Sequence, residues 1–303
     1  MTLKYEILKR IVKAIGIKRI WDRDPGLIVE RKRRQNRRNR IPALNDPDLL
    51  IGTMMTDGFP VIRMIHKKEA KKACIFLIGG GMVSAPRPAS VRKALKVAKQ
   101  SGLDLYVPYY PLCTDHPITR AYEMIGKLYE KLLERYDAKD IVLLGTSSGG
   151  NLALGLVAHL NATKSFLPRP GYVMAISPGT CPVSEEERRR MKELDQKDVA
   201  IPMSYMDSAV TIMTHGEDVP EYMLYLQKGD YSGLSELTLI YGSDEVLYAF
   251  APSLEEAVKR SKVPYELIVG EGMFHCYPVF PIVKEAKDGW DLMIERLKDF
   301  KDR

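Results

Sequence analysis

Short apolar runs alternate with longer amphipathic stretches from about residue 61 to the end of this 303-residue chain. Several runs are apolar throughout, as strands buried on both faces are, and the stretches between them have a helical period. This alternation is typical of a mostly parallel sheet covered by helices, a doubly wound α/β fold. We predict strands at 61–66, 74–78, 103–109, 141–144, 172–177, 237–241 and 265–269, and helices at 89–99, 118–136, 149–160, 251–262 and 283–300.

One segment interrupts the alternation. Residues 183–234 begin with a charged run, contain several methionines and tyrosines, and show no clean strand. We interpret this segment as a helical insertion above the sheet. The core then comprises residues 61–182 and 235–303, a length that one α/β domain can hold.

The basic charge of the chain is concentrated at its N-terminus. The first 40 residues carry a net charge of +10, whereas the remainder carries −3. Residues 2–15 have the spacing of an amphipathic helix, and an arginine-rich run at 31–40 follows a turn expected at 24–26. We predict that this arm packs on the body with its arginines in solvent. An anionic membrane surface is the first alternative partner. Nucleic acid is a weaker one, because no aromatic residues are interleaved.

Composition and cysteine spacing exclude several other classes of protein. Apolar residues make up 45% of the chain and charged residues 28%, as in ordinary globular proteins. No apolar run is long enough to span a membrane, and the first residues lack the apolar segment of a signal peptide, which favours a cytoplasmic location. No C-x-x-C pair occurs, so we expect reduced thiols and no metal site at Cys74, Cys113, Cys181 and Cys276.

The strongest local signal is a serine between two glycines, placed where a predicted strand gives way to a helix. In Gly145-Thr146-Ser147-Ser148-Gly149, Ser147 has a glycine two residues before it and another two residues after it. A nucleophilic serine on a sharp strand-to-helix turn needs small residues at both positions. Ser148 does not fit, because Thr146 would then occupy a crowded position. We therefore predict that Ser147 is a nucleophile.

A second signal is the glycine run Gly79, Gly80 and Gly81, which directly follows the predicted strand at 74–78. A loop without side chains lets backbone N–H groups converge on a developing oxyanion, and the N–H of Ser148 at the helix start is a further donor. A dinucleotide-binding loop is a poorer interpretation. The spacing is not G-x-G-x-x-G, and no acidic residue ends a following strand at the expected place.

A serine nucleophile needs a base, and the base needs an acid that orients it. Three histidines lie downstream of Ser147. His159 falls within the predicted helix after the serine, and His215 falls in the insertion. His275 instead follows the last predicted strand, at a strand end where catalytic groups belong. We predict that His275 is the base.

The acid is expected after the preceding strand of the sheet. Asp244 and Glu245 stand there side by side, shortly after the predicted strand at 237–241. Their chemistry does not choose between them. The other carboxylate would be a solvated loop residue or a helix-capping group.

With these motifs the chain resembles the hormone-sensitive-lipase-like family of α/β-hydrolase esterases over residues 61–301. The motifs H-G-G-G-[FW], D-Y-R-L-A-P-E-H-P-F, G-D-S-A-G-G, S-P, G-x-x-D-x-L and G-x-x-H are matched, in this order, by residues 78–82, 109–118, 145–150, 177–178, 242–247 and 272–275. The resemblance implies the α/β-hydrolase fold. By the register of G-x-x-D-x-L it selects Glu245 over Asp244 as the acid.

The resemblance implies a serine carboxylesterase that hydrolyses short- to medium-chain acyl esters of small alcohols, with no cofactor or metal. It implies that the arm at 1–60 and the insertion at 183–234 form a cap over the acyl pocket and, by analogy alone, that the protein is a homodimer. The implied site consists of the catalytic residues Ser147, Glu245 and His275 and the oxyanion-hole residues Gly79, Gly80, Gly81 and Ser148.

The chain also departs from the family motifs. Ile78 replaces the histidine that supports the glycine loop, so we expect the N–H donors of Gly80 and Gly81 to be held less firmly. The other departures are Thr146 for aspartate, Ser148 for alanine, Tyr109 for aspartate and Pro111 for arginine. Two alternatives stay open. One is a related hydrolase of amides, acetylated sugars or lipids that docks on a membrane through its basic arm; the other is a non-catalytic protein that binds a small ligand in the cap pocket.

Overall fold

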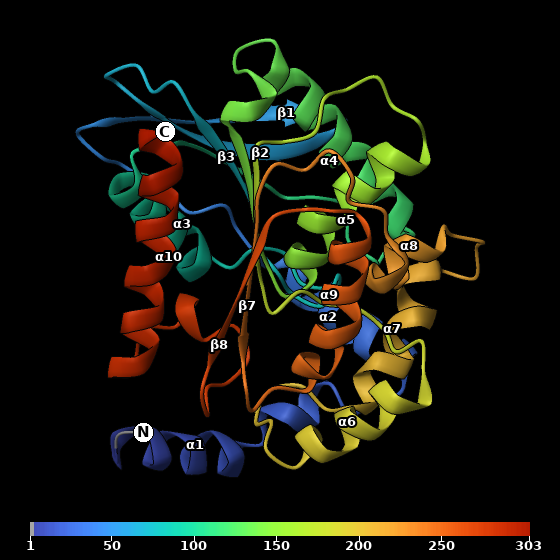
Figure 1. Ribbon diagram of the computed structural model, residues 1–303. Helices are drawn as coiled ribbons and strands as arrows, with labels where there is room; N and C mark the ends of the chain where they lie inside the picture. Colours follow the sequence, from blue (N-terminus) through green and yellow to red (C-terminus); the bar gives the residue numbers. More distant parts are fainter. Residues whose placement is uncertain (1–2) are drawn as a thin grey trace.

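An eight-stranded sheet forms the centre of the computed structural model, which describes residues 3–303 (Figure 1). The strand order is β1-β2-β4-β3-β5-β6-β7-β8, with β1 and β2 antiparallel to their neighbours and the other strands parallel. The strands are β1 (Leu49–Thr56), β2 (Phe59–His66), β3 (Ala73–Leu77), β4 (Asp104–Pro108), β5 (Ile141–Thr146), β6 (Tyr172–Ile176), β7 (Leu237–Gly242) and β8 (Tyr265–Gly270).

Helices cover both faces of this sheet (Figure 1). One face carries α3 (Pro88–Ser101) and α10 (Lys284–Asp302), and the other carries α4 (Ile118–Leu133), α5 (Ser148–Ala162) and α9 (Ala251–Arg260). Every residue of β3, β4, β5, β6 and β7 is buried. Strands enclosed between two helical layers need apolar residues at successive positions, which is why their runs are recognisable. The predicted α/β architecture is confirmed.

The N-terminal segment and the insertion pack against each other. The helices of the first segment are α1 (Leu3–Ile15), η1 (Ile17–Ile20) and α2 (Pro25–Arg37). Residues 183–234 form α6 (Glu185–Asp195), α7 (Ser204–Thr214), α8 (Glu221–Leu224) and η3 (Leu226–Lys228), and contain no strand. α2 packs against α7. Trp21 lies edge-on against Tyr205, with 4.8 Å between ring centroids.

Residues 49–56 correct the predicted boundary of the core. The hydropathy pattern places them in the arm, but they form β1, which pairs with β2 along its whole length. β1 is an edge strand, and most of its residues are partly or fully exposed. It therefore lacks the continuous apolar run by which the inner strands are recognised. The sheet begins at Leu49 rather than near residue 61.

The turn predicted at 24–26 is instead the start of a helix. The Asp24 side chain caps α2 by accepting the N–H groups of Gly26 (2.8 Å) and Leu27 (3.3 Å). Pro25 takes the first helical position, where no N–H is needed. The arginine-rich run of α2 leaves several side chains in solvent, namely Arg31, Arg34 and Arg37.

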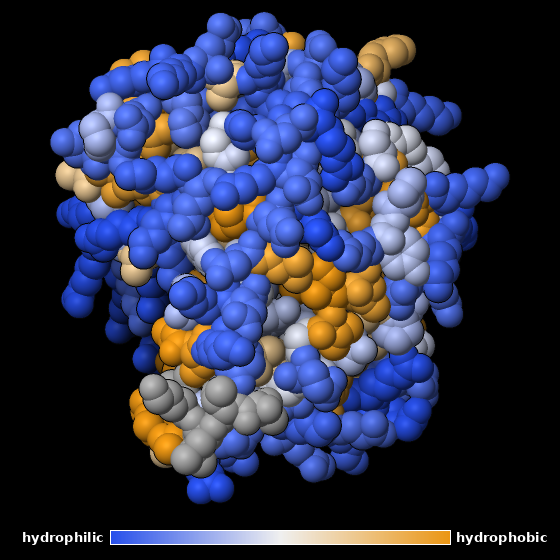
Figure 2. Space-filling view, turned by 60° about the vertical axis from the view of Figure 1, so that its left-hand side comes forward, coloured by the Kyte–Doolittle hydropathy of each residue, from blue (hydrophilic) through white to orange (hydrophobic). Residues whose placement is uncertain are grey.

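One face of α1 docks on the body. Tyr5 is buried and its hydroxyl donates to the carbonyl of Gly272 (2.7 Å), while Lys9 pairs with Asp244. Ile7, Ile11 and Ile15 are exposed apolar side chains of α1. On the face drawn in Figure 2, hydrophilic side chains predominate and apolar patches lie between them. No helix among residues 3–303 combines the length and hydropathy needed to cross a bilayer.

The contact between α4 and α5 yields a stability prediction. A Cβ on Gly155 would lie 1.9 Å from the hydroxyl of the buried Tyr122, so Gly155→Ala should lower the free energy of unfolding by about 1–3 kcal/mol. A Cβ on Gly126 of α4 would meet no atom within 4 Å, so Gly126→Ala should raise it by about 0.5–1 kcal/mol. Urea denaturation measures the free energy of unfolding of both variants. A Gly155→Ala protein at least as stable as wild type would contradict this packing.

Candidate active site

Ser147 occupies a sharp turn between β5 and α5. Its backbone has φ 53° and ψ −125°, a conformation that residues with a side chain rarely adopt. A Cβ on Gly145 would lie 2.2 Å from the carbonyl oxygen of Gly149, and one on Gly149 would lie 1.9 Å from that of Leu77. Both glycines are therefore required for the turn, which lifts the Ser147 side chain above the end of the strand.

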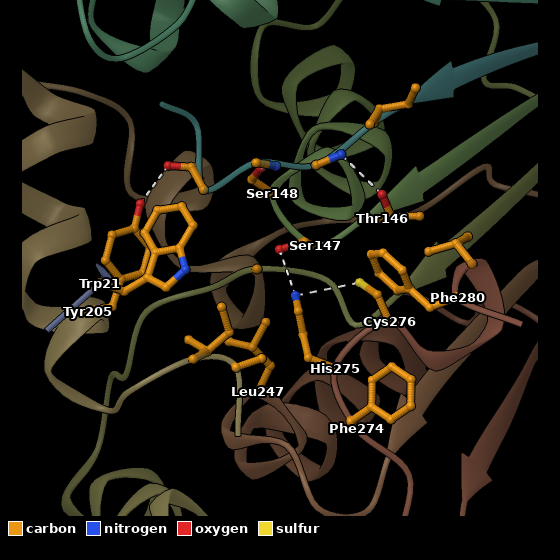
Figure 3. A pocket seen from close by; sticks show the side chains of 18 of the residues that line it. Trp21, Thr146, Ser147, Ser148, Tyr205, Leu247, Phe274, His275, Cys276 and Phe280 are labelled. Atoms are coloured by element: carbon orange, nitrogen blue, oxygen red, sulfur yellow. Dashed lines mark hydrogen bonds between the residues drawn. The ribbon is translucent and has the colours of Figure 1, made fainter. Parts of the chain in front are cut away.

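The side chain of Ser147 begins a hydrogen-bonded chain of three residues, and Figure 3 shows its first contact, between Ser147 and His275. Its Oγ lies 3.0 Å from Nε2 of His275, and Nδ1 of His275 lies 2.5 Å from Oε2 of Glu245. His275 and Glu245 follow β8 and β7, which lie on the same side of β5 in the sheet. The structure thus brings the three predicted residues together as nucleophile, base and orienting acid would be arranged.

Opposing effects act on the pKa of His275. Burial lowers the pKa of its imidazole, whereas the charges of Cys276 and Glu245 and the hydrogen bonds to them raise it, and the net direction is upward. Cys276, whose Sγ lies 3.5 Å from Nε2, is part of the cavity wall (Figure 3). Glu245 is completely buried. Its carboxylate therefore favours a positive charge on the imidazole.

Asp244 faces away from the histidine. Its side chain pairs with Lys9 of α1, and its N–H donates to the carbonyl of Met273 (3.0 Å). The other two histidines downstream of Ser147 also contact residues outside the Ser147–His275–Glu245 chain. Nδ1 of His159 lies 2.8 Å from the Tyr222 hydroxyl, and Nε2 of His215 lies 2.8 Å from the Cys113 carbonyl oxygen.

Ser177 is a site residue that the sequence pattern did not single out. Its hydroxyl donates to Oε1 of Glu245 (2.7 Å) and accepts the N–H of Cys276 (2.9 Å). The N–H of Gly242 also donates to Oε1, at 2.8 Å. Ser177 thus holds the acid and the residue after His275 in one fixed arrangement. The Ser-Pro pair at the end of β6 was the only sequence feature that pointed to Ser177, and the pair alone does not indicate what this serine does.

Asp198, in the insertion, is a second such residue. Its Oδ1 accepts the N–H groups of Ala200 (2.7 Å) and Ile201 (3.0 Å), and its Oδ2 accepts that of Val246 (2.8 Å). Burial raises the pKa of this carboxyl. The contact with Val246 ties the insertion to the residue after Glu245. No motif around Asp198 marks it, because its partners come together only in the folded chain.

The glycine loop is held by hydroxyl groups at two positions where the sequence departs from the family motifs. The N–H of Gly79 donates to Oγ1 of Thr146, and the N–H of Gly80 donates to Oγ of Ser148, both at 3.0 Å. Among residues 3–303 we find no acceptor for the N–H groups of Gly81 and Ser148. Of the four predicted oxyanion donors, these two are therefore free in this structure.

Ile78 does not leave the glycine loop unsupported. Its side chain is buried among apolar residues, and its carbonyl accepts a hydrogen bond from the hydroxyl of Tyr110 (2.8 Å). On the other side of the loop, the Tyr205 hydroxyl donates to the carbonyl of Gly81 (2.6 Å). The loop is thus fixed at both ends by tyrosines without the family histidine.

A cavity of about 680 Å³ opens above Ser147. Its walls come from the N-terminal segment, the core and the insertion, and most of its lining side chains are apolar. Trp21 and Tyr205 stand beside the glycine loop, and Leu247, Phe274 and Phe280 stand around His275 (Figure 3). This volume and lining suit a small, largely apolar molecule.

Comparison with known proteins agrees with this geometry. Residues 74–279 match the model of a family described as having the alpha/beta hydrolase fold. The chain belongs to this α/β-hydrolase family. The chain is 26% identical over 245 residues to an acetyl-hydrolase of Streptomyces hygroscopicus, covering 78% of this chain and 79% of that one. It is 25% identical over 183 residues to an esterase of Acinetobacter venetianus, where it spans 59% of the relative's length and 58% of its own.

Solved structures show the same fold for this chain. An esterase/lipase from an uncultured bacterium superimposes with a TM-score of 0.81 at 20% identity, with all of both chains covered. An esterase from the bacterial hormone-sensitive lipase family superimposes with a TM-score of 0.77 at 20% identity, covering 96% of this chain and 98% of that one. The predicted resemblance to this group and the predicted fold are confirmed.

The structure of this chain also shows where its possible metal ligands and its cysteines lie. Within residues 3–303, no three His, Cys, Asp or Glu side chains gather as a metal site would require. The four cysteines are buried free thiols. The cavity lining combines Ser147 and His275 with several basic side chains.

The position of Ser177 yields a second prediction. Ser177→Ala leaves the buried N–H of Cys276 without an acceptor, so the free energy of unfolding should fall by about 1–3 kcal/mol. Ser208→Ala on α7, where the hydroxyl has no partner among the described residues, is the matched control and should stay within about 0.5 kcal/mol of wild type. Equal unfolding midpoints in urea for the two variants would contradict the assigned role of Ser177.

Proposed function

We propose that this protein is a serine carboxylesterase that hydrolyses short- to medium-chain acyl esters through an acyl-enzyme on Ser147. The observation that carries the proposal is the hydrogen-bonded chain from Ser147 through His275 to Glu245, whose Ser147 end lies in a largely apolar cavity. The names of the relatives, an acetyl-hydrolase and an esterase, support the same reaction class.

In the first half-reaction, Oγ of Ser147 attacks the ester carbonyl carbon while Nε2 of His275 takes its proton. The Glu245 carboxylate holds Nδ1–H in place and stabilises the imidazolium that forms. The free N–H groups of Gly81 and Ser148 bind the tetrahedral oxyanion. Gly80 can add a third donor only by giving up its bond to the Ser148 hydroxyl, and Gly79 only by giving up Thr146.

The tetrahedral intermediate then collapses: its bond to the alcohol oxygen breaks, His275 gives its proton to that oxygen, and the departing alcohol leaves the acyl-enzyme on Ser147. In the second half-reaction, a water molecule takes the place of the alcohol. His275 removes a proton from this water, whose oxygen attacks the acyl carbon. The bond between the acyl carbon and Oγ of Ser147 then breaks, His275 returns the proton to Oγ, and the carboxylic acid is released. These steps use water, the side chains of Ser147, His275 and Glu245, and the backbone N–H groups of Gly81 and Ser148. Helices α1 and α2 together with residues 183–234 form the cap in this proposal, and their apolar residues surround the acyl chain.

The proposal predicts turnover that depends on one hydroxyl. Wild type should release p-nitrophenol from acetyl, butyryl, octanoyl or palmitoyl esters, with the chain-length profile reporting the size of the cavity. Ser147→Ala should lower kcat/KM by at least about 10³-fold, because the covalent route is lost. Circular dichroism confirms that the variant is folded. A folded wild type with no turnover on any ester would favour the non-catalytic ligand-binding alternative.

The pKa of His275 gives a pH prediction. Only the neutral imidazole acts as base, and its pKa is raised, so kcat/KM should fall on the acid side with an inflection above about 6.5. Glu245→Gln removes a charge that raises this pKa, so the inflection should move to lower pH and kcat should fall. Asp244→Asn is the matched control and should leave the inflection in place, because Asp244 pairs with Lys9. An inflection that moves with Asp244 instead would reassign the acid.

A further inference from the structure

The cavity above Ser147 is lined by basic residues and by no acidic ones. Among its lining residues, all within the described chain, there is no aspartate or glutamate. Four basic residues line it: Lys9, Lys32, Arg87 and Lys93. Lys9 is paired with Asp244, and Nζ of Lys93 donates to the carbonyl of Val279 (2.5 Å). Lys32 and Arg87 have no hydrogen-bond acceptor or ion-pair partner among residues 3–303.

Lys32 is the more telling of these two residues. It lies on α2 and is only 3% exposed, yet no carboxylate of the described chain pairs with it. Its Nζ lies 4.0 Å from the centre of the Trp21 ring. Such a contact offsets part, but not all, of the cost of burying an ammonium group away from water. Burial, with the charges of Arg87 and Arg31, lowers the pKa of Lys32 to about 8, so the group still carries its charge at neutral pH.

Two aromatic side chains connect Lys32 to the reaction centre. Trp21 contacts both the ammonium group of Lys32 and the ring of Tyr205. Tyr205 in turn donates to the carbonyl of Gly81, whose N–H is a free oxyanion donor (Figure 3). Lys32 thus lies near the glycine loop, within the same cavity as Ser147. Arg87 is exposed and also borders the cavity.

We propose that the substrate is an acyl ester that carries a carboxylate or phosphate group, which binds to Lys32 and Arg87 while its ester bond lies at Ser147. The inference rests on the proposed esterase function and adds the substrate class. A negatively charged oxygen supplies the acceptor that Lys32 lacks within the protein. A wholly neutral ester in the cavity would leave the charge of the buried ammonium group without a counter-ion.

The test compares two esters that differ by one charged group. p-Nitrophenyl hydrogen adipate and p-nitrophenyl hexanoate have acyl chains of equal length, and only the adipate ends in a carboxylate. For wild type we expect the larger kcat/KM with the adipate, after subtraction of the spontaneous rate.

Lys32→Met, which keeps most of the length of the side chain without its charge, should reduce the adipate-to-hexanoate ratio of kcat/KM by at least about tenfold. Lys32→Arg should restore most of the ratio. Arg37→Met, which removes a charge from the exposed side of α2, should leave the ratio unchanged.

A second pair distinguishes the source of the negative charge. Acetylated glycerol 3-phosphate and glycerol monoacetate are compared in a pH-stat, which measures acid release. A Lys32-dependent preference in this pair alone assigns a phosphate on the alcohol side, and one in the adipate pair alone assigns a carboxylate on the acyl side. Ratios that do not respond to Lys32→Met in either pair would overturn the proposal.

Failure of this proposal can be distinguished from failure of the proposed esterase function, by kinetics where an ester is hydrolysed and by ligand binding where none is. If hexanoate is hydrolysed by wild type and not by Ser147→Ala, but the ratios do not depend on Lys32, the function stands and the substrate class is wrong. If no ester is hydrolysed, titration of tryptophan fluorescence with adipate and with inorganic phosphate still tests the site, because Lys32 contacts Trp21. Saturable quenching that Lys32→Met abolishes would support the anion site, and its absence in wild type would refute it.

Discussion

A serine with a positive φ can stand at the end of β5 only because Gly145 and Gly149 leave room for the backbone around it. That turn sets where the nucleophile lies, and the sheet sets where its partners lie. β5, β6, β7 and β8 are parallel neighbours, so their carboxyl ends meet at one edge. Ser177, Glu245 and His275 follow three of these strands and meet there. The hydrogen-bonded chain from Glu245 through His275 to Ser147 is thus a consequence of the strand order.

The electrostatics of the site follow from burial. Glu245 has no solvent contact, and its two oxygens are satisfied by Ser177, Gly242 and His275. A buried carboxylate with these fixed donors stays oriented, and it favours a charged imidazole. Lys32 is the opposite case, because it is a buried cation without an anionic partner among residues 3–303. Groups of the protein stabilise the carboxylate of Glu245, whereas the proposed substrate supplies the counter-ion of Lys32.

Much of this arrangement could be predicted from sequence, because buried parallel strands and a glycine-flanked serine have strong local patterns. Ser147 and His275 followed from strand ends, whereas the choice of Glu245 over Asp244 needed the family register and is consistent with the geometry. β1 was missed, since an exposed edge strand has no continuous apolar run. The contacts of Ser177, Asp198 and Lys32 could not be predicted, because each joins segments that are distant in the chain. The hydroxyls of Thr146 and Ser148, which stood out only as departures from a motif, hold the glycine loop.

The central claim is that Ser147 is an activated nucleophile, and mass spectrometry tests it most directly. The folded protein would be treated with a p-nitrophenyl alkylphosphonate, digested and mapped. We expect one stoichiometric adduct on the peptide that contains Ser147, formed more slowly when Glu245 is replaced by glutamine. An unmodified Ser147 in folded protein, or an adduct on another residue, would contradict the claim.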